Sequence, residues 1–372
     1  MPRSVAVAVP ETSIGRVSAA AYEIPTDSPE SDGTLAWEST TLVVVEIEAG
    51  GRTGLGYTYC DATAARLIHS KLAQVLEKRD AFAIEGACTA MATSVRNIGR
   101  PGVAACAISA LDIALWDLKA QLLNVSLASL LGIAREDVRI YGSGGFTSYS
   151  DKQMCDQLSG WVEQGCTAVK MKVGREPERD LARVGVARTA IGPEVELFVD
   201  ANGAYARKQA LNFAEEFIRH GIVWFEEPVS SDDLAGLHLL RDRAPPNMDI
   251  AAGEYGYTPF YFRHMLEAGA VDVLQADATR CGGITGFLRA AALCDAFSIP
   301  LSSHCAPSAH VAAAASAPRV RHMEWFHDHV RIEQMLFDGA PHVREGHIAP
   351  DLSRSGNGLA FRGADAKRYE VS

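Results

Sequence analysis

Eight short apolar runs recur at a nearly even spacing in this chain of 372 residues. Counted from Val138, the later runs start near 168, 196, 222, 249, 271, 299 and 322, at intervals of roughly 22 to 30 residues. The stretches between them have a helical pattern, as in QALNFAEEFIRHG at 209–221. Eight strands alternating with helices predict a closed (β/α) barrel, which needs about 200 residues or more. A doubly wound open sheet is the alternative, but eight evenly spaced units favour closure.

The residues before the barrel predict a smaller unit of mixed structure. Strand-like runs cover 14–24, 40–48 and 53–59, and Gly50-Gly51 predicts the turn between the last two. Apolar residues then recur at steps of three and four, the pattern of one face of an amphipathic helix: Ile108, Leu111, Leu115, Leu118 and Leu122. Three strands followed by helices predict an α+β unit.

These patterns divide the chain into three segments. We expect the α+β domain at 1–125, the barrel at 126–335 and, at 336–372, a C-terminal segment that returns to the first domain. With 48% of its residues apolar, the chain has enough material for one or two full-sized cores.

Charge and composition exclude several classes of partner. The formal net charge of -11 argues against a nucleic acid or an anionic membrane surface. No apolar run approaches the roughly 18 residues of a membrane span. The N-terminus is interrupted by Pro10 and Glu11 and lacks the apolar stretch of a signal peptide. Eight cysteines without a C-x-x-C pair predict buried thiols in a reducing, cytoplasmic location.

Polar side chains stand at the carboxyl ends of seven successive strands, where a barrel builds its active site. They are Lys170, Lys172, Asp200, Asn202, Glu226, Glu254, Asp277, His304 and Glu324. Any one of them could be an ordinary loop charge. Seven successive occurrences at equivalent positions predict a site.

Three of these residues predict a metal centre. Asp200, Glu226 and Glu254 follow three consecutive strands, so their oxygens can converge on one point. Three hard oxygen ligands suit Mg²⁺ before Mn²⁺ or Ca²⁺. Zinc is not expected at this point, because the three strands offer no thiolate and no pair of histidines.

The remaining strand ends predict two bases. Asp277 and His304 end adjacent strands, so the carboxylate can hold one imidazole nitrogen and leave the other as a general acid or base. Lys170 and Lys172 point the same way from one strand, and their mutual repulsion beside a metal predicts a lowered pKa for one of them. Glu227, beside Glu226, is expected on the opposite side of its strand.

As a set, the strand-end motifs resemble the mandelate racemase subgroup of the enolase superfamily, within the mandelate racemase/muconate lactonizing enzyme family. The motifs are K-M-K at 170–172, V-D-A-N-G at 199–203, E-E-P at 226–228, A-G-E at 252–254, Q-A-D at 275–277 and S-S-H-C at 302–305. SALDIALWDLKAQ at 109–121 also matches, so the resemblance covers nearly the whole chain. It implies an α/β fold: a modified TIM barrel, (β/α)₇β, with an α+β N-terminal capping domain completed by the C-terminal segment.

The resemblance also implies roles for individual residues. Asp200, Glu226 and Glu254 would bind Mg²⁺. Lys172 would be the base on one face of the substrate, and His304 with Asp277 the base or acid on the other face. Lys170 would neutralise the substrate carboxylate, and Glu324 would hydrogen-bond a carboxylate oxygen as it gains charge. A lysine in place of Asp277 would have indicated the muconate-lactonizing subgroup.

In such enzymes the capping domain selects the substrate, and we expect one selecting loop over 22–38. This segment has five acidic residues and no Lys or Arg, which counts against a diacid and fits a hydroxyl-rich monoacid sugar. A cationic substrate and a solvated loop without a binding role are the other interpretations. We predict substrate contacts at Tyr22, Trp37, Ser143 and Asn202.

The predicted reaction is Mg²⁺-dependent abstraction of the α-proton of a hydroxy carboxylate through a metal-stabilised enolate, followed by β-elimination of water. Racemisation or epimerisation of a 2-hydroxy acid and lactone cycloisomerisation are the alternatives. The expected partner is a small-molecule carboxylate, and we expect a homo-oligomer. A metal-dependent amidohydrolase would need an H-x-H pair where Tyr141-Gly142-Ser143 stands. A non-catalytic sugar-binding protein would have no use for a ligand triad, two lysines and a dyad.

Overall fold

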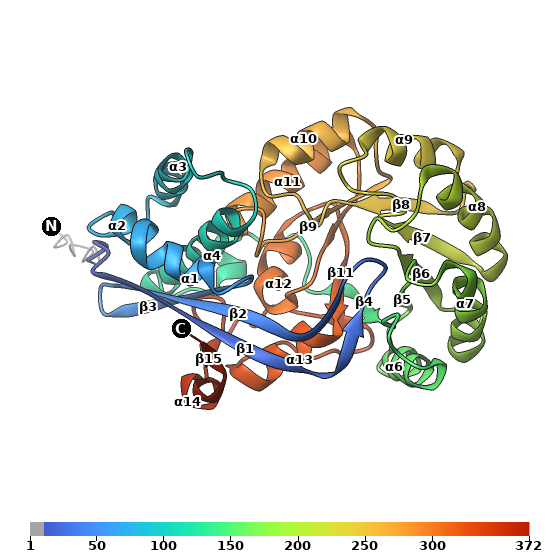
Figure 1. The fold of residues 1–372 in the computed structure, drawn as a ribbon. Coiled ribbons are helices and arrows are strands. Elements are labelled where there is room, and N and C mark those ends of the chain that lie inside the picture. Colours follow the sequence, from blue (N-terminus) through green and yellow to red (C-terminus); the bar gives the residue numbers. More distant parts are fainter. Residues whose placement is uncertain (1–10, 372) are drawn as a thin grey trace, which may run out of the picture.

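The carboxyl half of the chain forms a closed barrel of eight parallel strands, seen in Figure 1 with its helices outside. This computed structural model describes residues 11–371. The barrel strands are β4(Val138–Gly144), β5(Ala168–Lys172), β6(Glu196–Asp200), β7(Ile222–Glu226), β8(Asp249–Ala252), β9(Val273–Ala276), β10(Leu301–Ser303) and β11(Val320–Phe326). Each strand pairs with the next, and β11 pairs with β4, which closes the ring. The predicted barrel is confirmed.

Helices on the outside of the barrel connect its strands. They are α6(Asp151–Glu163), α7(Pro177–Ile191), α8(Arg207–Phe217) with the 3₁₀ turn η2(Ile218–His220), α9(Leu234–Arg243), α10(Pro259–Glu267), α11(Gly283–Phe297), α12(Pro307–Ser316) and, after the last strand, α13(His327–Leu336). Local sequence signals fix where several begin. Ser150 and Gln153 form a capping box at the start of α6, and Pro177, Pro259 and Pro307 occupy first turns, where no backbone N–H is needed.

The N-terminal domain is a sheet packed against helices. Its strands are β1(Arg16–Ser31), β2(Ala36–Ala49) and β3(Arg52–Tyr59), and its helices are α1(Thr63–Leu67), the π-helix η1(Ile68–Leu72), α2(Ala73–Leu76), α3(Ile84–Ser94), α4(Val103–Leu122) and α5(Leu127–Leu131). The helix predicted from its apolar face is α4. In Figure 1 the β1–β2 hairpin runs from this domain to the barrel near β4.

The segment 22–38 is part of that hairpin, and its prediction as a loop is wrong. Strand β1 continues to Ser31 and strand β2 begins at Ala36, so only four residues form the turn between them. The prolines hid this from sequence reasoning, because proline is rare in regular strands. Here Pro25 and Pro29 fall at a shift in strand register, where the regular ladder is interrupted.

The C-terminal segment runs from the barrel back to the first sheet. Its elements are β12(Phe337–Asp338), β13(His347–Ile348), β14(Ala360–Phe361), α14(Gly363–Ala366), the 3₁₀ turn η3(Lys367–Tyr369) and β15(Glu370–Val371). Strand β13 pairs with β4, and β15 pairs antiparallel with β1. The exact limits 1–125, 126–335 and 336–372 stay a prediction. The prediction that the N-terminus is not a signal peptide falls on residues 1–10, which lie outside those described.

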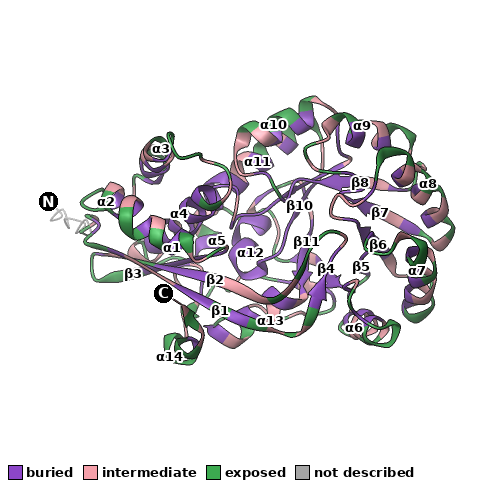
Figure 2. Cartoon of the chain, viewed as in Figure 1, coloured by how far each residue is buried: buried purple, intermediate pink, exposed green. Residues whose placement is uncertain are grey.

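Aromatic side chains fill the lower half of the barrel beneath the strand ends. Tyr141, Phe198, Trp224 and His322 are all buried, and their rings contact one another across the interior. Figure 2 shows the barrel strands as the most continuously buried part of the chain. This floor keeps water out from below. Within residues 11–371, no helix has the length and apolar character to cross a lipid bilayer.

Buried carboxylates on α4 join the parts of the molecule. Asp112 accepts hydrogen bonds from the backbone N–H and the hydroxyl of Thr285, at the start of α11. Asp117 accepts from the backbone N–H groups of Leu55 in β3, at 2.7 Å, and Asn357 in the C-terminal segment, at 2.6 Å. These contacts explain the two aspartates in the apolar SALDIALWDLKAQ motif.

We expect Asp117→Ala to lower the free energy of unfolding by about 2–3 kcal/mol, because it leaves two backbone N–H groups without their acceptor. Urea denaturation followed by circular dichroism measures the change. Asp156→Ala removes an exposed aspartate and is the control, with an expected effect within about 0.5 kcal/mol. Equal stability of the two variants would show that Asp117 does not hold the segments together.

Candidate active site

Three buried carboxylates meet at the mouth of the barrel. One oxygen each from Asp200, Glu226 and Glu254 lies within 4.8 Å of the others. Asp200 and Glu226 are register partners at the ends of β6 and β7. Glu254 follows Gly253, whose φ is 138° and whose added Cβ would lie 2.1 Å from the carbonyl oxygen of Gln275. Only glycine therefore lets the end of β8 turn this close to β9 and bring Glu254 to the centre.

Two lysines from β5 bind these carboxylates. Lys170 Nζ lies 2.5 Å from Glu226 Oε1, 2.8 Å from Glu324 Oε1 and 3.6 Å from Asp200 Oδ2. Lys172 Nζ donates to Asp200 Oδ2. Burial by itself lowers a lysine pKa, but the charges of Glu226 and Glu324 raise the pKa of Lys170, and that of Asp200 raises the pKa of Lys172. The predicted lowering is not found in this arrangement, because the surrounding carboxylates outnumber the two ammonium groups.

The aromatic floor positions this cluster from below. The indole N–H of Trp224 donates to Glu226 Oε2 at 2.9 Å, and the ring of Tyr141 lies 5.3 Å from Lys170 Nζ. Burial and the neighbouring charge of Asp200 raise the pKa of Glu226 to about 8. A further positive charge beside Glu226, in addition to the two lysines, would favour its ionised form.

The predicted histidine–aspartate pair is present on the other side of the mouth. Asp277 Oδ2 lies 2.8 Å from His304 Nδ1, and Asp277 Oδ1 accepts from the backbone N–H and hydroxyl of Thr279, each at 2.7 Å. His304 Nε2 lies 3.4 Å from Glu254 Oε2, so this nitrogen faces the carboxylates. Burial opposes protonation, but Glu254 and Asp277 outweigh it and raise the pKa of His304.

Glu324 lies between the two sides. Its Oε1 accepts from Ser143 Oγ at 2.6 Å and its Oε2 from the backbone N–H of Cys305 at 2.8 Å. Burial opposes ionisation, yet Lys170 and His304 bring the pKa of Glu324 well below its ordinary value. Ser143 is buried and donates to Glu324, and its contact with a substrate stays a prediction.

Two neighbours of the ligand residues have left-handed backbone conformations. Asn202 has a φ of 45° and donates its backbone N–H to Asp200 Oδ1, while its own Oδ1 has no hydrogen-bond partner within residues 11–371. Glu227 has a φ of 37°, which ends the strand alternation after Glu226. Burial and then Glu254 raise the pKa of Glu227 well above its ordinary value. The expectation that Glu227 points away from the site is therefore wrong.

Arg280 is a site residue that sequence reasoning missed. Its guanidinium lies 3.5 Å from Glu254 Oε1 and 3.6 Å from Asp277 Oδ2, and it stacks over Tyr255 at 5.4 Å. It therefore joins the carboxylate cluster to the histidine–aspartate pair. The sequence feature that could have identified Arg280 is its position three residues after Asp277, in the loop that follows β9.

The hairpin turn closes over the barrel mouth. An added Cβ on Gly33 would lie 2.4 Å from the carbonyl oxygen of Ala201 and 2.7 Å from that of Val173, in the loops after β6 and β5. Trp37 packs edge-on against Phe146, just beyond β4, at 5.7 Å. The hairpin backbone thus reaches the strand ends, and Trp37 lies beside them.

Tyr22 does not lie at the mouth. Its ring packs against Phe361 of the C-terminal segment at 5.3 Å, and its backbone is paired with Glu370 of β15. This position corrects the prediction, because a strand continuing to Ser31 carries Tyr22 away from the turn that covers the barrel. We therefore exclude Tyr22 from the substrate contacts.

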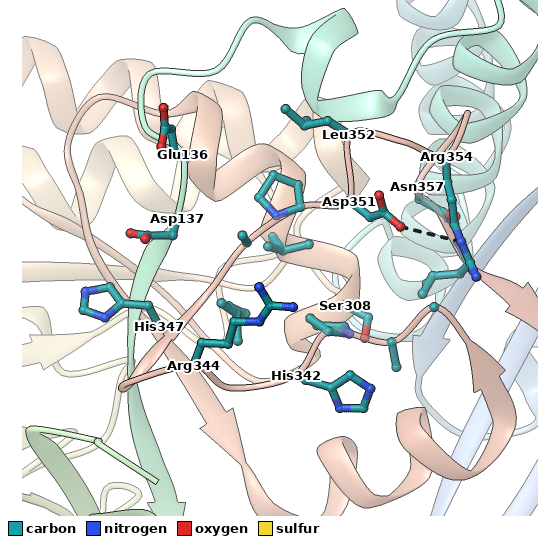
Figure 3. A pocket seen from close by; sticks show the side chains of 18 residues that line it. Glu136, Asp137, Ser308, His342, Arg344, His347, Asp351, Leu352, Arg354 and Asn357 are labelled. Carbon is teal, nitrogen blue, oxygen red and sulfur yellow. Dashed lines mark hydrogen bonds and ion pairs between the residues drawn. The ribbon is translucent and has the colours of Figure 1, made fainter.

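A cavity of about 760 Å³ lies elsewhere, between the C-terminal segment and the barrel wall. Figure 3 shows Arg344 and His342 pointing into it, with Glu136 and Asp137 on another side and Arg354 beside Asp351. None of the strand-end side chains lines this cavity. The volume of a cavity therefore does not identify the reaction centre in this protein. The buried charged side chains at the barrel mouth are the better indicator.

The donor set at the mouth fits Mg²⁺. Three buried carboxylates supply hard oxygens, and Glu254 Oε2 has no hydrogen-bond partner within the described residues. A buried carboxylate oxygen without a hydrogen bond favours a nearby cation, and a metal ion at the three carboxylates would supply one. Asp200, Glu226 and Glu254 would hold the ion.

Solved structures of known proteins match this fold over nearly its full length. A mandelate racemase/muconate lactonizing enzyme-like protein from Rubrobacter xylanophilus is 52% identical, with a TM-score of 0.94, over 96% of this chain and 100% of that one. A racemase from Streptomyces coelicolor A3(2) with bound magnesium is 32% identical, with a TM-score of 0.91, over 96% and 100%.

Relatives of known activity match at similar levels. A 3,6-anhydro-alpha-L-galactonate cycloisomerase from Streptomyces coelicolor is 33% identical over 92% of this chain and 98% of its own. An arabinonate dehydratase from Saccharolobus solfataricus is 29% identical over 90% and 92%.

Family models cover both domains. Residues 21–132 match the N-terminal domain of the mandelate racemase/muconate lactonizing enzymes, and residues 153–366 match the enolase C-terminal domain-like family. The chain therefore belongs to the mandelate racemase/muconate lactonizing enzyme family of the enolase superfamily.

Proposed function

We propose that this enzyme removes the α-proton of an acid sugar and then expels the β-hydroxyl as water, as an acid-sugar dehydratase. The observation that carries the proposal is the order of groups around the barrel. Lys172 on β5 and His304 after β10 flank an arc that holds the three carboxylates on β6, β7 and β8. A substrate carboxylate bound at that arc would place its α-carbon between two proton-transfer groups.

Lys172 is the base that we assign to one face of the α-carbon. Lys172 Nζ lies beside Asp200 and is almost fully buried; once it has lost a proton, its neutral amine can accept the α-proton with little competition from water. When bound, Mg²⁺ supplies positive charge that offsets these carboxylates, eases proton loss from Lys172 and polarises the substrate carboxylate.

His304 is the acid that we assign to the β-hydroxyl. Asp277 holds Nδ1, which fixes the imidazole and leaves Nε2 to carry the transferred proton toward the substrate. Glu254 and Asp277 raise the pKa of His304, which favours the protonated imidazole that a general acid needs. Elimination of water needs one base and one acid on opposite sides of the substrate. Lys172 would be the base and His304 the acid.

Lys170 stabilises the negative charge that moves onto the substrate carboxylate, and Glu324 would hydrogen-bond a carboxylate oxygen there once it carries a proton. Lys170 is completely buried, so its positive charge acts in a medium of low polarity. Glu324 is held by Ser143 and the backbone of Cys305, which fixes the direction in which it meets a carboxylate oxygen. Asn202, with an unpartnered Oδ1, and Trp37 remain our candidates for substrate contacts.

Cycloisomerisation is the second candidate, because a relative with 33% identity over nearly its whole length is a cycloisomerase. The same two groups would act, but the leaving oxygen would belong to a ring. Racemisation would use His304 to return a proton to the α-carbon. A mono-acid substrate, a homo-oligomeric state and a cytoplasmic location remain predictions.

A library of mono- and diacid sugars, incubated with the Mg²⁺-loaded enzyme, tests the assignment. We expect a 2-keto-3-deoxy product from at least one acid sugar, with a solvent deuterium at C3, where the enol left by elimination is protonated as it becomes the ketone. Lys172→Ala and His304→Asn should each lower turnover by about 10²–10⁴-fold, because each removes one proton-transfer group. Formation of an epimer without a keto product would show that the reaction is racemisation or epimerisation and not dehydration. Undiminished deuterium exchange in both variants would contradict the two-base arrangement itself.

Glu226→Gln should weaken Mg²⁺ binding by more than about tenfold, since it removes one anionic ligand and disturbs its bond with Lys170. Isothermal titration of metal-free enzyme with MgCl₂ measures this affinity. Glu196→Gln, at the opposite end of β6, is the control and should bind Mg²⁺ normally. Unchanged affinity of a folded Glu226→Gln variant would remove Glu226 from the metal site.

Gly33→Ala should raise KM more than it lowers kcat, because a Cβ there displaces the hairpin turn from the backbone of Ala201 and Val173. Steady-state kinetics with an acid sugar that the screen identifies as a substrate measures KM and kcat separately. Gly160→Ala on α6 is the control, since nothing lies within 4 Å of its added Cβ. Wild-type KM in Gly33→Ala would mean that hairpin closure does not contribute to substrate binding.

A further inference from the structure

Outside the barrel mouth, a cluster of residues that could hold a metal ion lies where the capping hairpin meets the barrel. One ligand atom each from Asp27, Glu30 and His327 lies within 4.8 Å of the others. Asp27 and Glu30 belong to β1, whereas His327 is the first residue of α13. His327 Nε2 lies 3.0 Å from Asp27 Oδ2. The three ligands therefore come from two domains.

The strand irregularity of β1 brings the two carboxylates together. In a regular strand, residues three apart point to opposite faces. Between Pro25 and Glu30 the pairing of β1 with β2 shifts its register, which places Asp27 and Glu30 on the same side. The same prolines that disguised the strand in the sequence thus accompany the shift that builds the cluster.

Glu30 is the observation that points to a ligand. Its side chain is 1% exposed, and its Oε2 accepts from the indole N–H of Trp37 at 2.8 Å. Its Oε1 is buried and has no hydrogen-bond partner in the described part of the chain. A buried carboxylate oxygen without a partner is costly, so this oxygen calls for a proton, a water molecule or a cation.

The charges around Glu30 favour a cation of charge two. Asp328 is close enough to act on Glu30, and both its oxygens are occupied, by Arg331 on one and by Thr40 on the other. Arg331 is the cation paired with Asp328. If Asp27, Glu30 and Asp328 are all ionised, they carry three negative charges against this one positive charge, a difference that a divalent cation would balance.

We propose that Asp27, Glu30 and His327 bind a divalent transition-metal ion of the Zn²⁺ class, separate from the Mg²⁺ site. Two carboxylate oxygens and one imidazole nitrogen suit zinc, with water in a fourth position. Donor atoms around a tetrahedral zinc lie roughly 3.3 Å apart for bonds of about 2.0–2.1 Å. The separation of 3.0 Å between Asp27 and His327 is close to that geometry.

An ion in this position would join the hairpin to the barrel. The ligands Asp27 and Glu30 lie just before the turn that carries Gly33, and His327 directly follows β11, which also carries Glu324. Metal binding would therefore stabilise the closed hairpin without touching the reacting atoms. The inference does not depend on the reaction proposed above.

Cobalt provides a spectroscopic test in the full-length, Mg²⁺-saturated protein. We expect one equivalent of Co²⁺ to bind under excess Mg²⁺, with visible absorption typical of a four-coordinate site. Glu30→Gln and His327→Ala should each weaken Co²⁺ binding by more than about tenfold. Losing a residue that merely orients a metal ligand already costs roughly tenfold, and each of these changes removes a ligand itself. Zn²⁺ should compete for the same site and raise the melting temperature of the wild type but not of these variants.

Three controls separate this site from others. Glu23→Gln removes an exposed carboxylate of the same hairpin, which accepts from Ser39, and should leave Co²⁺ binding unchanged. His342→Ala removes an exposed histidine of the C-terminal segment, which lines the separate cavity of Figure 3, with the same expectation. Glu226→Gln should also keep the Co²⁺ site, even where Mg²⁺ binding is lost. Wild-type protein that binds no Co²⁺ under excess Mg²⁺, or folded Glu30→Gln and His327→Ala proteins that bind it normally, would overturn the proposal and leave Glu30 as a protonated acid.

Discussion

Buried charge at the barrel mouth is the constraint on which the rest of this structure depends. Five carboxylates lose water there, and each must meet a positive charge or a hydrogen-bond donor. They are Asp200, Glu226, Glu254, Asp277 and Glu324. Lys170, Lys172 and Arg280 supply three positive charges within 3.6 Å of them. The buried carboxylates outnumber these cations, and a divalent cation would offset part of the difference, so the metal site and the lysines belong to one electrostatic unit.

That unit needs a rigid and dry support, which the barrel floor provides. Trp224 fills the interior and also donates to Glu226, so one side chain excludes water and fixes a ligand at once. Strand alternation produces this arrangement, because residues two apart on β7 share the inner face. The charged layer consequently stands directly on the aromatic one. Replacing either layer would disturb the other, which couples the stability of the barrel to the geometry of its mouth.

Much of this could be predicted from the sequence, for a physical reason. Strands and helices of the barrel repeat with a regular period, and the strand ends carry charges that have no place in an ordinary core. The barrel, the carboxylate cluster and the contact of Asp277 with His304 follow from those patterns. Arg280 did not, because it lies in a loop whose conformation no period reveals. Glu227 did not, because a positive φ ended the alternation on which its direction was predicted.

The capping hairpin shows where sequence patterns lose their meaning. Its acidic residues suggested a polar surface for a hydroxyl-rich substrate, but most of them serve the hairpin itself. Asp32 accepts from the backbone N–H groups of Thr34 and Leu35, and Glu30 accepts from Trp37. Asp27 binds His327 of the barrel. The acidity of this segment is thus a property of its folding and docking, and it carries no information about a sugar's hydroxyl groups. We propose that the substrate is selected by side chains close to the strand ends, among them Trp37, which packs on Phe146, and Asn202, whose buried amide oxygen has no hydrogen-bond partner among residues 11–371. Because the acidic side chains above them are engaged within the hairpin and with the barrel, the charge of the hairpin is a poor guide to the substrate, and the identity of these neighbouring side chains is a better one.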